Sequence, residues 1–61
     1  MNESYKLKGG EKEYDKFINA LKVAEAKAED ENKTITVQKK VMNSLEDVTK
    51  VHPSGKREDI E

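Results

Sequence analysis

The sequence predicts an all-α fold, an antiparallel two-helix hairpin with disordered tails that dimerises into a four-helix arrangement. Two stripes of apolar residues at helical spacing predict the two helices. The chain has only 61 residues, of which 33% are hydrophobic, so its core is thin and a second copy would supply what one hairpin lacks. We therefore expect the apolar helix faces to form core and interface together.

Residues 1–10 are expected to form a flexible N-terminal segment. Gly9-Gly10 interrupts any helix or strand that runs into it. Before this pair, Tyr5-Lys6-Leu7-Lys8 alternates apolar and basic residues, a pattern that also fits a short half-buried strand. Four residues leave both interpretations open.

Residues 11–29 are predicted to form the first helix, because they contain no glycine or proline and are rich in alanine, lysine and glutamate. Glu11 and Glu13 would lie in its first turn and complement the helix dipole. The apolar residues recur mostly at spacings of three and four, which is typical of one buried face. This first stripe consists of Tyr14, Phe17, Ile18, Leu21, Ala24 and Ala28.

Residues 30–34 are predicted to be a polar turn, and residues 35–51 the second helix. Thr34-Ile35-Thr36-Val37 is ambiguous, since β-branched residues favour strands whereas a threonine can cap a helix. The downstream spacing favours a helix. Its stripe consists of Val37, Val41, Met42, Leu45 and Val48. Leu45 would lie at its centre, so Leu45→Asp is expected to unfold the chain.

Residues 53–61 are predicted to be a disordered, charged tail. Pro53 disfavours a helical conformation at His52 and should end the second helix there. This places the helical hairpin within residues 11–52. His52 is the only histidine and would be a solvated residue at a frayed helix end.

The composition argues against an enzyme, a metal site or a cofactor. Cysteine is absent and a single histidine cannot build a histidine-based site. The 12 basic and 13 acidic residues nearly cancel, which disfavours indiscriminate binding to nucleic acid or to a membrane. No apolar run could span a bilayer, and the first residues lack the features of a signal peptide, so we expect a cytoplasmic protein.

The expected function is that of a non-enzymatic interaction, assembly or regulatory protein that acts through its apolar helix faces. Its partner would be a second copy of itself, another protein, or both. Neither a small-molecule substrate nor a membrane is expected as a partner. The motivating feature is apolar surface that one hairpin would leave uncovered.

An alternative follows from the order of a short alternating segment, a long helix, a polar turn and a second helix. This order resembles the ribbon-helix-helix family of dimeric repressors, and Val41-Met42-Asn43-Ser44-Leu45 is similar in texture to that family's second helix. The resemblance implies that two copies pair their N-terminal strands, with Lys6 and Lys8 reaching into the DNA major groove. Thr34 and Thr36 would then meet a phosphate at the start of the second helix.

Overall fold

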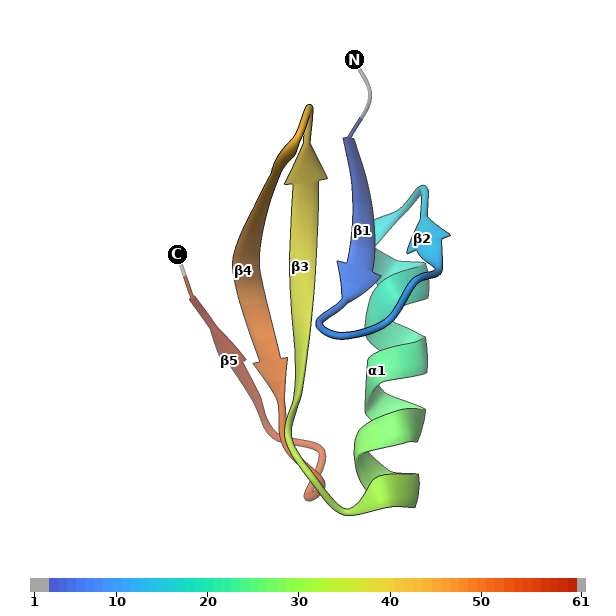
Figure 1. The fold of residues 1–61 in the computed structure, drawn as a ribbon. Coiled ribbons are helices and arrows are strands. Elements are labelled where there is room, and N and C mark those ends of the chain that lie inside the picture. Colours follow the sequence, from blue (N-terminus) through green and yellow to red (C-terminus); the bar gives the residue numbers. More distant parts are fainter. Residues whose placement is uncertain (1–2, 61) are drawn as a thin grey trace.

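The computed structural model describes residues 3–60 and shows a five-stranded antiparallel sheet with one helix packed on one of its faces (Figure 1). The strand order is β2-β1-β3-β4-β5. The elements are β1 (Glu3–Leu7), β2 (Glu13–Tyr14), α1 (Phe17–Glu31), β3 (Ile35–Val41), β4 (Ser44–Val51) and β5 (Arg57–Asp59). The predicted all-α hairpin, and the four-helix dimer built from it, are therefore wrong.

The second predicted helix, residues 35–51, is instead the β3–β4 hairpin. A spacing of four fits a strand as well as a helix, because it is an even number and puts Val37 and Val41 on the same strand face. The spacing of three between Leu45 and Val48 arises differently. Val37 lies opposite Thr49 while the next residue, Gln38, lies opposite Asp47, so Val48 is the extra residue of a β-bulge.

The first predicted helix, residues 11–29, begins later and ends slightly later than expected. Glu11 and Glu13 precede α1, and Glu13 and Tyr14 form β2 opposite Lys6 and Tyr5 of β1. The helix has no acidic residue in its first turn. It ends at Glu31 and is capped by Asn32, whose N–H donates to the carbonyl of Ala28. The left-handed backbone of Asn32 (φ 53°) then turns the chain so that the N–H of Lys33 donates to the same carbonyl at 3.1 Å.

Both predicted tails contain strands within the described residues. In the N-terminal segment, residues 3–7 form β1, which pairs with β2 on one side and β3 on the other. In the C-terminal segment, residues 57–59 form β5 along β4. Residues 1, 2 and 61, which belong to the same two predicted segments, lie outside the described residues.

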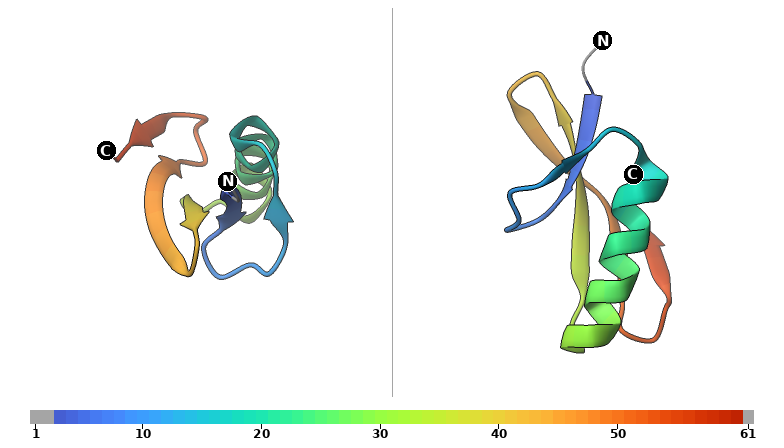
Figure 2. Two further views of the ribbon diagram at one scale, coloured as in Figure 1. Left: turned by 90° about the horizontal axis from the view of Figure 1, so that it is seen from above. Right: turned by 90° about the vertical axis from the view of Figure 1, so that its right-hand side faces the viewer.

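The core lies between α1 and the concave side of the sheet, which curls around the helix (Figure 2). Val37 and Val51 are fully buried, and burial of a valine side chain stabilises by about 1.5–3 kcal/mol. Ala20, Ala24 and Ala28 are fully buried on α1, and their small side chains let the helix approach the strands closely. Leu7, Leu21 and Ile35 complete the buried cluster. The helix face thus packs on a sheet instead of on a second helix.

Candidate functional site

The tip of the β3–β4 hairpin carries the most exposed large hydrophobic side chain of the described residues. Val41 pairs with Ser44, which leaves Met42 and Asn43 as a two-residue loop. Met42 is 85% exposed and has φ 57°, a conformation that costs a residue with a Cβ roughly 1–2 kcal/mol. Glycine is the usual residue in such loops. The fold therefore holds a large apolar side chain in water, on a backbone that would suit glycine better.

Below this tip, one edge of β4 has no neighbouring strand within the described residues. The short β5 pairs with residues 49–51, and the N–H of Ile60 donates to the carbonyl of Val48 at 2.9 Å. Within residues 3–60, no strand pairs with the edge of Ser44–Asp47 (Figure 1). In an antiparallel ladder, alternate residues direct their N–H and C=O groups away from the paired strand. Leu45 is 47% exposed on this stretch and lies opposite Lys40, on the sheet face turned away from α1. Main-chain hydrogen-bonding groups and an apolar side chain are thus available together.

Hydrogen bonds and ion pairs connect the β3–β4 hairpin to β1 and β2. The ammonium of Lys40 donates a hydrogen bond to Oε2 of Glu13 at 3.1 Å, and Ser4 Oγ donates to Oε1 of the same carboxylate at 3.2 Å. The hydrogen bond and the charge of Lys40, followed by the hydrogen bond from Ser4, lower the pKa of Glu13. Lys39 pairs with Glu3 at 3.6 Å. These contacts hold the strands near the tip in register.

The residues of the two predicted stripes are divided between the core and the surface. Leu21, Ala24, Ala28 and Val37 are buried, and Tyr14, Phe17 and Val48 are half-buried against the core. Tyr14 lies in β2 and not in the helix. Val41 is half-buried, whereas Ile18, Met42 and Leu45 are exposed. Leu45 was predicted to be a core residue, and its exposed position near the tip corrects that expectation.

The residues that the ribbon-helix-helix resemblance assigned to DNA lie within a single sheet. Lys6 is in β1, between Glu13 and Gln38, and Thr36 is in β3 opposite Lys50. Lys8 is exposed in the β1–β2 loop, and Thr34 precedes β3. The first strand pairs within its own chain on both sides, and β3 and β4 replace the second helix. The ribbon-helix-helix architecture that the resemblance implied is therefore wrong for the described residues.

His52 takes part in a cluster that the sequence reasoning missed. Its Nδ1 lies 3.0 Å from the hydroxyl of Thr34, and its Nε2 lies 3.2 Å from a carboxylate oxygen of Glu58. A carboxylate can only accept, so Nε2 carries a proton, and in the neutral ring Nδ1 accepts from the Thr34 hydroxyl. The imidazole thus connects the α1–β3 turn to β5. Sequence spacing gives no sign of this contact, because the partners come from separate elements.

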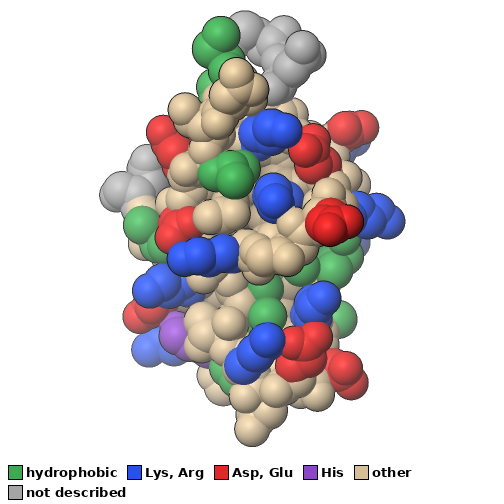
Figure 3. Space-filling view, in the orientation of Figure 1, with side chains coloured by type: hydrophobic (Ala, Val, Ile, Leu, Met, Phe, Trp, Pro, Cys, Tyr) green, Lys and Arg blue, Asp and Glu red, His purple; other side chains and the backbone are tan. Residues whose placement is uncertain are grey.

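The sheet face turned away from α1 presents lysines and acidic side chains intermixed, with few hydrophobic groups among them (Figure 3). Within residues 3–60, no three His, Asp or Glu side chains gather as a group that could hold a metal ion. In the same part of the chain, no helix has both the length and the apolar composition needed to cross a membrane.

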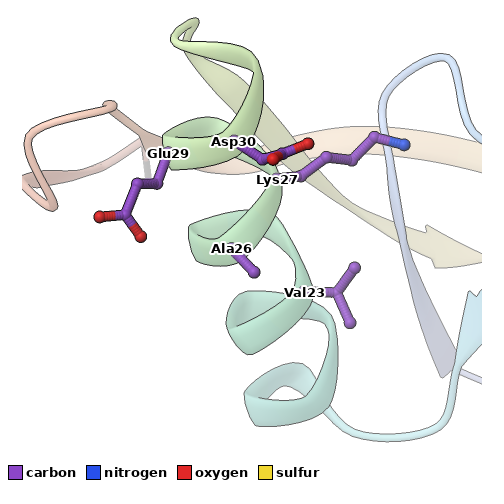
Figure 4. A pocket seen from close by; sticks show the side chains of 5 residues that line it. All are labelled: Val23, Ala26, Lys27, Glu29 and Asp30. Carbon is purple, nitrogen blue, oxygen red and sulfur yellow. The ribbon is translucent and has the colours of Figure 1, made fainter.

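An open hollow on the outer side of α1 is lined by Val23, Ala26, Lys27, Glu29 and Asp30 (Figure 4). Its side chains diverge. Val23 and Lys27 point toward the β1–β2 loop, while Glu29 points away from them (Figure 4). Polar groups that recognise a small molecule converge on one position, so this hollow is a weaker candidate than the hairpin.

Comparison of the chain with protein-family models, with curated proteins and with solved structures finds no match.

Proposed function

We propose that this chain is a non-enzymatic binding module, and that an extended segment of another protein adds as a strand to the free edge of β4. The observation that carries the proposal is the position of Met42 and Leu45, 85% and 47% exposed, beside the unpaired edge of Ser44–Asp47. Main-chain hydrogen bonds to an added strand supply affinity, and alternate side chains supply specificity. Water solvates the main-chain groups of the edge but is a poor environment for the apolar side chains of Met42 and Leu45, and a bound strand would cover both.

The charges on the free edge indicate the chemistry of the added strand. Glu46 and Asp47 follow Leu45, and Asp47 already accepts a hydrogen bond of 2.8 Å from Gln38. Opposite charges across neighbouring strands stabilise and like charges destabilise. The preferred segment therefore has an apolar residue facing Leu45 and a basic residue facing Glu46. A second copy of β4 would instead bring acidic residues of both copies near each other.

A site-specific photo-crosslinker tests this proposal. Placed at position 45 in an otherwise unchanged chain, it should capture a defined protein from extracts of the source cells. The matched control carries the same group at position 22, an exposed lysine of α1. Capture at 45 that is absent at 22 and is lost in Met42→Asp supports the proposal. Identical products from both positions would contradict it.

Sedimentation equilibrium at micromolar concentration separates this partner from self-association. The proposed module is a monomer without its partner. A dimer that dissociates in Leu45→Asp would show that the free edge of β4 takes a second copy instead of another protein. The same crosslinker would then join two copies of this chain instead of capturing another protein.

A further inference from the structure

A second surface, separate from the free edge of β4, lies between the β1–β2 loop and the C-terminal half of α1. The groove there has a volume of about 370 Å³. Leu7 and Ile35 form its buried floor, and Tyr14 and Val23 add partly exposed apolar surface. The groove can therefore accept an apolar side chain without first rearranging the core.

Main-chain hydrogen bonds fix the wall that the β1–β2 loop forms. The N–H of Lys8 donates to the carbonyl of Thr36 at 2.9 Å, and the N–H of Gly10 donates to the carbonyl of Leu7 at the same distance. Gly9 has φ 85°, and a Cβ at Gly10 would lie only 3.3 Å from the Leu7 carbonyl oxygen. The positive φ of Gly9 thus favours glycine there, and a side chain at position 10 would require the loop to shift slightly. A wall of this kind loses little conformational entropy when a ligand binds.

The rim of the groove is basic, although the chain as a whole has a net charge of −1. Four lysines and two glutamates line it: Lys8, Lys12, Lys27, Lys33, Glu11 and Glu31. Lys33 and Lys27 share Glu31, at 3.2 Å and 3.9 Å. Lys12 lies over the ring of Tyr14, 5.4 Å from its centroid. One carboxylate between two ammonium groups leaves positive charge uncompensated on this rim.

We propose that this groove binds an acidic peptide segment of a partner protein, with one apolar side chain of that segment on the floor. The rim and the floor together define this ligand. A small anion would leave the apolar surface of Tyr14 and Val23 exposed to water, and an uncharged peptide would gain nothing from the charges of the rim. Because the lysine ammonium groups are mobile point charges, the carboxylates of a flexible segment match them better than one rigid polyanion does.

Titration of isotope-labelled protein followed by amide chemical shifts provides the test. The probe is a short peptide of glutamates and aspartates around a single phenylalanine, at low ionic strength. We expect shifts at Gly9, Gly10, Lys33 and Ile35, which weaken when salt is raised to about 0.5 M and screens the charges. A peptide with alanine for phenylalanine should bind more weakly, and one with lysines for its acids should not bind.

Charge-reversal variants distinguish a local site from a general charge effect. Lys8→Glu with Lys12→Glu replaces two positive rim charges by negative ones and should weaken binding of the acidic peptide about tenfold. The matched control, Lys22→Glu with Lys56→Glu, makes the same change in net charge at two exposed positions that do not line the groove. It should weaken binding no more than about twofold.

Three results would overturn the proposal: no shifts at the groove, equal losses in the two double variants, or tighter binding of a single-stranded oligonucleotide at the same amides. None of these results bears on the free edge of β4. Conversely, failure of the crosslinking experiment at position 45 would leave the groove unaffected.

Discussion

The two ends of the β3–β4 hairpin have opposite surroundings. At one end, Val37 and Val51 are fully buried beneath α1. At the other, the hairpin extends past the beginning of the helix, and Met42 and Leu45 remain in solvent (Figure 1). Met42 lies beyond the helix and Leu45 lies on the sheet face turned away from α1, so the position of the helix decides which apolar residues become core. One half of the hairpin thus contributes to the core, and the other half carries the exposed residues on which the proposed binding rests.

Aspartate substitutions at the two ends of the hairpin should differ most in their effect on the free energy of unfolding. Val37→Asp buries an unpaired charge and should cost several kcal/mol, enough to unfold a domain whose stability is of the order of 5 kcal/mol. Leu45→Asp should change the free energy of unfolding by less than about 1 kcal/mol. Urea denaturation followed by circular dichroism measures both. Equal destabilisation of the two variants would place Leu45 in the core after all.

Enlarging an alanine tests how tightly the helix approaches the covered half. Ala24 is fully buried against the sheet, and Ala24→Leu should destabilise by about 1–3 kcal/mol through overpacking. Ala26 is exposed on the same helix, so Ala26→Leu should lie within about 0.5 kcal/mol of the parent. Thermal melting of the pair gives the comparison. A neutral Ala24→Leu would mean that space remains between α1 and the strands.

At the uncovered end, removing a side chain should stabilise the fold. Met42→Gly relieves the positive φ but adds freedom to the unfolded chain, for a net gain of about 0.5–1 kcal/mol. Met42→Leu keeps the Cβ and should be neutral within about 0.5 kcal/mol. A gain in unfolding free energy together with loss of capture at position 45 would show that the strained residue serves binding. If Met42→Gly is no more stable than the parent, the positive φ of Met42 does not destabilise the fold.

The smallest effect is expected for the ion pair between Lys40 of β3 and Glu13 of β2. Lys40 lowers the pKa of Glu13, so the stabilisation from this pair is present above the pKa of the unfolded chain. It is lost as the pH falls through the lower pKa of the folded protein. Titration followed by the side-chain carboxyl resonance should show the pKa of Glu13 rising in Lys40→Gln. An unchanged pKa in that variant would exclude Lys40 as the cause.

Local periodicity found the helix but could not identify the strands. The spacing of Leu21, Ala24 and Ala28 has no strand equivalent, and these residues lie on the buried face of α1. Val37 and Val41 are four apart, which fits either element, and the bulge at Val48 supplied a spacing of three that imitated a helix. The turn residues Met42-Asn43 include no glycine, so the usual signal of a hairpin was absent.

The candidate sites depended on facts that no local pattern contains. Within the described residues, the edge of Ser44–Asp47 lies beyond the stretch that pairs with β5, and the groove forms where the β1–β2 loop lies beside α1. The exposure of Met42 follows from the same tertiary arrangement. The spacing of the apolar residues placed both Met42 and Leu45 on a predicted helix, and it wrongly made Leu45 the centre of a buried stripe.

The position of β1 has a consequence for how the chain folds. It comes first in the described sequence but lies between β2 and β3, and its Leu7 pairs with Val37, thirty residues further on. Closing so long a loop costs chain entropy before any contact compensates for it, whereas the β3–β4 hairpin closes over two residues. We expect the hairpin and β5 to form early in the transition state, and β1 to join last together with α1. Substitutions of Leu7 should then accelerate unfolding and leave the folding rate nearly unchanged, which stopped-flow kinetics can measure.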